Sequence, residues 1–216
     1  MRCSASTPPR LPTRFPIDSF VTDGSRAWAA LAALLCGLAV LAHWLPAASI
    51  DWQPTLAWRE PWRAFSAAAL HYSTLHLVAN LAGAVLVGAL GVTARLPMHV
   101  AVAWFVAWPL TQLGLLVQPA LLHFGGLSGV LHAGVAAVSV HLLLAAKGRP
   151  RWIGAATLAV VCTKVLSESP WGPPLRHPAD WDIAVAPLAH ASGLVAGMLC
   201  ALAAHAIATL RRPHGA

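Results

Sequence analysis

The amino-acid sequence predicts an all-α, polytopic membrane protein. Of its 216 residues, 58% are hydrophobic and only 10% are charged, which excludes an ordinary soluble globular domain. The apolar residues gather in six segments of about 20 residues, the length that crosses a bilayer as a helix. Lipid offers the backbone no hydrogen-bonding partner, so each crossing must be helical. We therefore expect a bundle of six transmembrane helices.

The six predicted spans share long apolar runs and are separated by short polar connections. They cover residues 27–48, 71–92, 97–118, 126–146, 151–167 and 184–210. We expect one membrane domain over 27–210, a disordered cytoplasmic tail over 1–26 that is rich in Pro, Ser, Thr and Arg, and a short cytoplasmic tail over 211–216. A cleaved signal peptide is the alternative at the N-terminus, because Ala47-Ala48-Ser49 follows the first apolar run. That run and the leader before it are longer than those of a usual signal peptide.

The Lys and Arg residues predict the orientation. With the N-terminus in the cytoplasm, ten of them lie inside and three lie outside, as the positive-inside rule requires. The ten are Arg2, Arg10, Arg14, Arg26, Arg95, Lys147, Arg149, Arg151, Arg211 and Arg212, and the three are Arg59, Arg63 and Arg176. Lys164, near the outer end of the fifth span, can snorkel and counts for neither side.

Charge and cysteine usage exclude several other classes. The formal net charge of +7 does not indicate nucleic-acid binding, because the cations form short clusters between apolar segments. The four cysteines lack paired short spacing and predict neither a disulfide framework nor a zinc site. All seven acidic residues lie outside the predicted spans, so we expect no carboxylate at membrane depth. The His, Asn and Ser residues inside the spans are therefore the functional candidates.

The fourth span opens with Phe124-Gly125-Gly126-Leu127-Ser128-Gly129-Val130, a glycine-rich loop that runs into a helix. Glycines beside Ser128 let backbone approach a substrate carbonyl, and the helix N-terminus supplies N–H groups for a developing oxyanion. Ser128 is thus a candidate nucleophile. The structural alternative is a serine N-cap with glycine packing.

The sixth span contains His190 one turn before the small-xxx-small pair Gly193 and Gly197. These glycines favour close approach of another helix. If that helix is the fourth span, whose face includes Gly129, His190 would meet Ser128 at hydrogen-bond range and act as its general base. An interhelical hydrogen bond without catalysis is the alternative for this histidine.

In the second span, His76 and Asn80 are four residues apart and so share one helix face. Two side-chain donors aimed at one spot suit a tetrahedral oxyanion. Polar contacts between helices are the alternative.

Together these motifs resemble the rhomboid family of intramembrane serine proteases. Over residues 60–205, four motifs occur in the same order along the chain as in that family. They are Trp62-Arg63; His76 and Asn80; Gly126, Ser128 and Gly129; and His190, Gly193 and Gly197. The resemblance implies Ser128 as nucleophile, His190 as base, and His76 with Asn80 and the Ser128 N–H as oxyanion donors. The absence of an intramembrane carboxylate agrees with a Ser-His dyad that has no third, orienting acid.

Two departures from the family pattern stand out. His132 occupies the position of a tyrosine that packs on the base, so it is expected either to stack on His190 or to hydrogen-bond to substrate. We expect His132, Gly126 and His71 to line the substrate pocket or pack on the base. The end of the second span also lacks a glutamate that many rhomboids carry there.

The stretch Gly-Leu-Ser-Gly-Val-Leu-His is similar to the rhombosortase branch, whose bacterial members are thought to process proteins with a C-terminal Gly-Gly sorting tail. This resemblance implies membrane-anchored substrates cut near a C-terminal transmembrane helix, a bacterial inner-membrane location and no cofactor.

The sequence fits three other functions less well. A zinc site built from His71, His76, His132 and His190 would lack an accompanying carboxylate or HExxH arrangement. A proteolytically inactive rhomboid relative that binds client helices would usually lack the Ser or the His. A transporter would show an inverted repeat, and none is evident.

Overall fold

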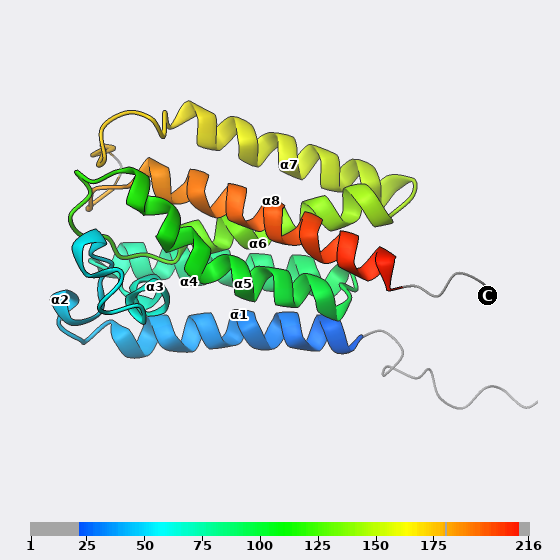
Figure 1. The fold of residues 1–216 in the computed structure, drawn as a ribbon, viewed down its shortest axis with the longest axis horizontal. Coiled ribbons are helices and arrows are strands. Elements are labelled where there is room, and N and C mark those ends of the chain that lie inside the picture. The colour runs from blue at the N-terminus through cyan, green and yellow to red at the C-terminus, as the bar shows by residue number, and fades with distance from the viewer. Residues whose placement is uncertain (1–21, 180, 212–216) are drawn as a thin grey trace, which may run out of the picture.

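The structure is a computed structural model that describes residues 22–179 and 181–211; the tail predictions for 1–21 and 212–216 lie outside them. Long helices run side by side along its long axis (Figure 1). They are α1 (Asp23–Ala42), α4 (Thr74–Thr93), α5 (Met98–Leu113), α6 (Ser128–Ala145), α7 (Arg149–Ser167) and α8 (Pro187–Leu210). Two short helices, α2 (Ala47–Ile50) and α3 (Arg63–Ser66), lie between α1 and α4. The described part of the chain has no strand, so the all-α prediction is confirmed.

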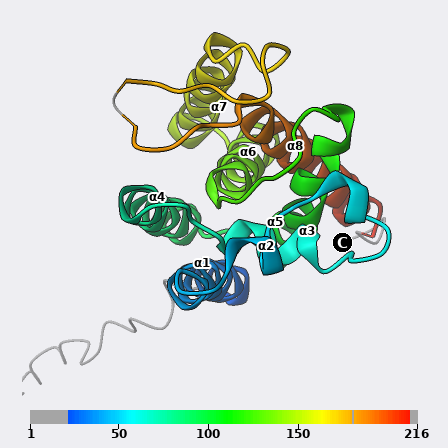
Figure 2. The ribbon, with the colours of Figure 1, turned by 90° about the vertical axis from the view of Figure 1, so that its left-hand side faces the viewer.

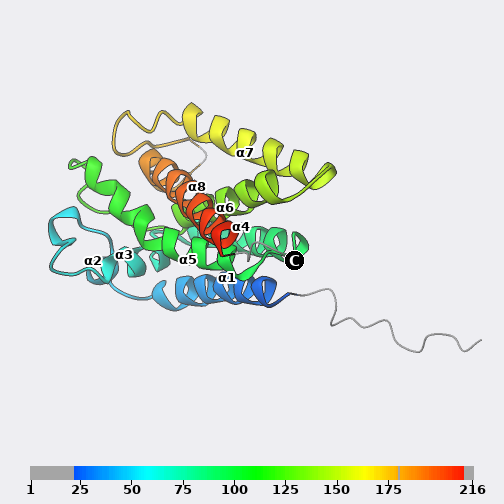
Figure 3. The ribbon, with the colours of Figure 1, turned by 45° about the vertical axis from the view of Figure 1, so that its right-hand side comes forward.

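Five helices in the described residues are long and apolar enough to cross a membrane: α1, α4, α5 with the turn that follows it, α6 and α8. The fifth predicted span forms α7, a helix of 19 residues that carries Arg149, Arg151 and Lys164 and so is less apolar than the others. It runs along the outside of the bundle beside α6 (Figure 3). The chain is thus a multi-pass membrane protein.

Two helices begin at residues other than those predicted, because a side-chain cap determines where each of them starts. α1 begins at Asp23, inside the predicted tail, because the Thr22 side chain accepts a hydrogen bond from the Ser25 N–H. α4 begins at Thr74 rather than at residue 71, because the Ser73 side chain caps it in the same way. Hydropathy alone does not register such caps.

α6 lies in the middle of the bundle, in contact with α4, α5, α7 and α8 (Figure 2). Two buried tryptophans pack against each other beside α6. The rings of Trp28 in α1 and Trp104 in α5 have centroids 4.3 Å apart. The Trp104 indole N–H donates to the Val130 carbonyl of α6 at 2.8 Å, and that of Trp28 donates to the Val87 carbonyl of α4 at 2.9 Å. Both donors are therefore satisfied in an apolar interior.

The helix ends that carry the predicted site residues meet at one end of the bundle, where α2 and α3 also lie (Figure 1). α4, α6 and α8 begin there and α7 ends there. The loop before α6 is tied to the α1–α4 connection by paired backbone hydrogen bonds of 2.7 and 3.0 Å between Trp52 and Phe124. A further bond of 2.9 Å joins the Gly126 N–H to the Ala67 carbonyl. These bonds hold the residues just before Ser128.

Candidate active site

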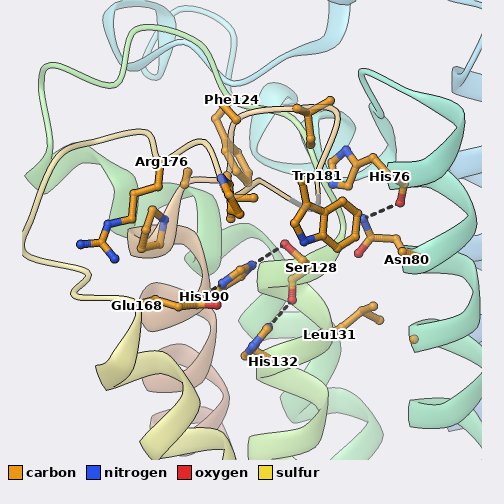
Figure 4. A pocket seen from close by; sticks show the side chains of 18 of the residues that line it. His76, Asn80, Phe124, Ser128, Leu131, His132, Glu168, Arg176, Trp181 and His190 are labelled. Atoms are coloured by element: carbon orange, nitrogen blue, oxygen red, sulfur yellow. Dashed lines mark hydrogen bonds and ion pairs between the residues drawn. The ribbon is translucent and has the colours of Figure 1, made fainter.

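Ser128 is the first residue of α6, and its hydroxyl faces the imidazole of His190 (Figure 4). Ser128 Oγ and His190 Nε2 are 2.9 Å apart, within hydrogen-bond range. Two residues before this serine the backbone requires glycine, because Gly126 has φ +150°, which side-chain-bearing residues rarely adopt. A Cβ at Gly126 would also lie 3.0 Å from Cε1 of His76. The loop thus brings Ser128 and His76 to the same region.

Close packing of α6 against α8 brings His190 to the serine. A Cβ at Gly193 would overlap the carbonyl of Gly129, and one at Gly197 would overlap the carbonyl of Ala133. A Cβ at Gly129 would lie 2.7 Å from the Ala189 carbonyl oxygen. The two helices therefore touch backbone to backbone through the small residues that the sequence singled out.

A carboxylate lies on the side of His190 that faces away from Ser128. Glu168, the C-cap residue that follows α7, places Oε2 2.6 Å from His190 Nδ1. The expectation of a Ser-His pair without a third, acidic residue was therefore wrong, because Glu168 contacts His190. Glu168 does lie outside the span, as predicted, but α7 ends beside the first turn of α8 and its side chain turns toward His190. Ser128, His190 and Glu168 form a continuous hydrogen-bonded row.

Glu168 is ionised at neutral pH. Burial on its own would raise its pKa, but the hydrogen bond and charge of His190, together with those of Lys164, lower the pKa to about 2. Lys164 Nζ lies 2.9 Å from Glu168 Oε1, one helical turn away. The lysine that could have snorkelled to the interface instead turns toward the site.

His132 stacks on His190, which is one of the two arrangements that its position predicted. The rings of His132 and His190 have centroids 4.4 Å apart and planes inclined by 18°. His132 Nδ1 lies 2.7 Å from the Ser128 carbonyl oxygen, and His132 Nε2 lies 2.9 Å from Lys164 Nζ. Since the carbonyl accepts and the ammonium donates, the proton of this imidazole is on Nδ1.

His76 and Asn80 line the same cavity as Ser128 (Figure 4). One N–H of the Asn80 amide donates to the His76 carbonyl at 3.1 Å, which leaves the second N–H of that amide for another acceptor. His76 Nδ1 is buried without a partner among the described residues. Both side chains retain donor capacity beside the cavity.

His71 lies behind His76 rather than in the cavity. The two rings have centroids 4.7 Å apart, and His71 Nδ1 lies 3.0 Å from the Ala69 carbonyl oxygen. Burial lowers the pKa of His71 to about 4, although the bond to Ala69 opposes the shift. The four histidines of the zinc alternative thus form two separate ring pairs, His71 with His76 and His132 with His190.

The site opens into a cavity of about 930 Å³ between α4, α6, α7 and the start of α8. Trp181, from the connection between α7 and α8, lies over it beside His76 and Asn80 (Figure 4). This connection is joined to the start of α4, because the Ser73 hydroxyl donates to Asp182 Oδ1 at 2.9 Å. The cavity is mostly apolar and places its polar groups near Ser128, as ligand-binding cavities generally do.

Sequence reasoning missed three features of the site: Glu168, Lys164 and the connection that carries Trp181. A usable signal was the pair Lys164 and Glu168, which are four residues apart at the end of the fifth span and so share a helix face. A charge pair there can face the bundle as readily as the lipid headgroups. The contact of Trp181 with the cavity has no comparable local signal.

Comparison with known proteins identifies the family. The family model of the Rhomboid domain matches residues 58–207, which include Ser128, His190, His76, Asn80, His132 and Glu168. A search of the curated proteins found no match. The matched region covers most of the chain, from the connection between α1 and α4 to the last turn of α8. The protein is therefore a member of the rhomboid family.

Proposed function

We propose that this protein is an intramembrane serine endopeptidase with Ser128 as nucleophile and His190 as general base. Rhomboid proteins generally are intramembrane serine proteases that act on membrane proteins, although some members are inactive. The observation that carries the proposal is the distance of 2.9 Å between Ser128 Oγ and His190 Nε2, inside a cavity. A nucleophile within hydrogen-bond reach of a base is the arrangement that acyl transfer needs.

In the proposed reaction, Ser128 Oγ attacks the substrate carbonyl carbon while its proton moves to His190 Nε2. The carbonyl electron pair moves to the oxygen, and the oxyanion is bound by His76, Asn80 and the Ser128 backbone N–H at the start of α6. His190 then protonates the leaving amine as the C–N bond breaks. Water, or another nucleophile, resolves the acyl-enzyme by the reverse sequence.

The proposed substrates are membrane-anchored proteins cut near a C-terminal transmembrane helix. The motif around Ser128 and the histidine at position 132 favour the rhombosortase branch, and with it Gly-Gly sorting tails. Small residues suit the site because they lower helix propensity and let the backbone reach Ser128. We also propose a bacterial inner-membrane location with both termini in the cytoplasm, because Lys and Arg gather at one set of loops.

Labelling of the detergent-solubilised protein with a fluorophosphonate tests this function. We expect wild-type protein to be labelled and Ser128→Ala and His190→Ala to be unlabelled. Ser139→Ala is the matched control, because Ser139 is a buried serine of the same helix whose hydroxyl has no partner among the described residues. It should label like wild type.

Failure to label, together with failure to cleave a Gly-Gly-tailed membrane substrate, would overturn the protease proposal and favour a client-binding rhomboid relative. Cleavage without labelling would show only that this reagent does not fit the cavity. Labelling that survives Ser128→Ala would place the reactive group elsewhere.

A further inference from the structure

We propose that Glu168 is the positioning residue of the base: it fixes the tautomer and orientation of His190, and Lys164 holds it in place. This inference rests on the proposed protease function and adds a third member to the Ser128 and His190 pair. It starts from the 2.6 Å contact between Glu168 Oε2 and His190 Nδ1. The contact links the end of α7 to the first turn of α8.

The two nitrogens of His190 must take opposite roles. To accept the Ser128 hydroxyl proton, Nε2 must carry no proton of its own, so a neutral ring carries its proton on Nδ1. An ionised carboxylate can only accept a hydrogen bond, and Glu168 Oε2 is placed to accept this one. The carboxylate therefore favours the tautomer that catalysis requires, as the acid of a serine-protease triad does.

Lys164 supports the carboxylate rather than competing with it. Its Nζ lies 2.9 Å from both Glu168 Oε1 and His132 Nε2, but 3.2 Å from His190 Nδ1. An ammonium group has no acceptor, so it cannot bond to a protonated Nδ1 and uses the first two partners. The lysine thus orients Glu168 and offsets its negative charge. The compensation matters because the Glu168 side chain is only 25% exposed.

The same lysine ties the stacking histidine to the nucleophile. Lys164 donates to His132 Nε2, and His132 Nδ1–H donates to the Ser128 carbonyl. His190 is thereby held on one edge by Glu168 and on one face by His132, and both of these depend on Lys164. With a side-chain exposure of 8%, the base has little freedom to take another orientation.

The charge of Glu168 also matters during the reaction. When the Ser128 proton reaches Nε2, the imidazole becomes a cation, and the nearby carboxylate stabilises it while accepting the Nδ1–H bond. Glu168 takes no proton at any step; the proton passes from Ser128 to His190 and then to the leaving amine. The residue acts through His190 and touches no reacting atom.

The experiment compares Glu168→Gln, Glu168→Ala and wild type by saturation kinetics of fluorophosphonate labelling. The Gln side chain keeps the size but offers an N–H donor, which favours the wrong tautomer. We expect the maximal labelling rate to fall by up to about 10⁴-fold, the loss caused by replacing the Asp of a serine-protease triad with Asn, with the half-saturating reagent concentration unchanged. Glu60→Gln is the control, because Glu60 pairs with Arg63 in the outer connection and does not line the cavity.

Chemical rescue separates positioning from folding. Glu168→Ala leaves a space beside the partly exposed carboxylate position, so formate should restore part of its labelling rate, which a purely structural role would not allow. A Glu168→Gln rate within a few-fold of wild type would overturn the proposal. If Glu168→Gln does not fold, the test rests on Glu168→Ala. A folded Glu168→Ala whose labelling rate formate does not restore would overturn the proposal equally. In both cases, labelling of the wild-type protein would still support the proposed protease function. Failure of the wild-type protein to label would instead count against that function itself.

Discussion

His132 lies flat against His190, with ring centroids 4.4 Å apart and an interplanar angle of 18°. The contact places an aromatic face on His190, where many rhomboids use tyrosine. It also joins that face to Ser128, since His132 Nδ1–H donates to the Ser128 carbonyl. Stacking and hydrogen bonding can be separated by substitution.

Replacement of His132 by an aromatic residue should preserve most of the labelling rate. Stacked aromatic pairs contribute about 0.5–1.5 kcal/mol beyond area burial, so His132→Ala should slow labelling by about 2- to 10-fold. His132→Phe and His132→Tyr keep the ring and should lie nearer to wild type. Equal losses in His132→Ala and His132→Phe would instead assign the main role to the hydrogen bonds with Lys164 and Ser128.

The oxyanion assignment predicts large kinetic losses without unfolding. Removal of one oxyanion donor typically costs about 10²- to 10³-fold in rate, so His76→Ala and Asn80→Ala should each lower substrate cleavage by that factor. Thermal unfolding in detergent should report folded protein in both variants. His141→Ala is the matched control, because this histidine lies on α6 about 20 Å along the helix axis from Ser128. Loss of activity in His141→Ala as well would point to a general packing effect.

The sequence alone predicted the features that depend on local pattern. Apolar length located all six long helices, and the small residues around Gly193 predicted the approach of α8 to α6. Glu168 was missed because its position depends on where α7 ends relative to α8, and no periodicity within either helix records that relation. Because Glu168 is charged, the sequence predicted that it lies outside a span. A residue at the end of a helix can nevertheless turn its side chain toward the interior of the bundle.

Helix packing at Gly193 predicts a strong effect of a single methyl group. Gly193→Ala would drive Cβ into the Gly129 carbonyl, and overpacking of this kind costs about 1–3 kcal/mol. The variant should unfold at a lower temperature in detergent and lose labelling. Gly37→Ala in α1 is the matched control, because nothing lies within 4 Å of a Cβ at that position. An equal Tm for Gly193→Ala and wild type would contradict the backbone-to-backbone contact.

Acidification should destabilise wild type more than Glu168→Gln. The pKa of Glu168 is lowered from its ordinary value of 4.5 to about 2, so its ionised form stabilises the folded protein fully above pH 4.5. That stabilisation is lost as the pH falls toward about 2, where the folded-state carboxyl takes up a proton. The Tm advantage of wild type over Glu168→Gln should therefore shrink across this interval. A difference that is independent of pH would show that the carboxylate is not held in its ionised form.

Access to the cavity should depend on the bond between Ser73 and Asp182. This bond joins the connection that carries Trp181 to the start of α4, and its net contribution is about 0.5–1.5 kcal/mol. Its loss in Asp182→Ala should raise the population of the open connection, and the labelling rate with a bulky fluorophosphonate, by at most about tenfold. A small fluorophosphonate, which needs less space, should respond less.

Asp182→Asn provides the control for this bond, because its amide oxygen can still accept from the Ser73 hydroxyl while the charge is removed. The Asn variant should label at the wild-type rate with both reagents. If Asn and Ala accelerate labelling equally, the charge of Asp182 rather than its hydrogen bond controls access. If neither changes the rate, the Trp181 connection does not limit entry, and reagents reach Ser128 by another opening of the cavity.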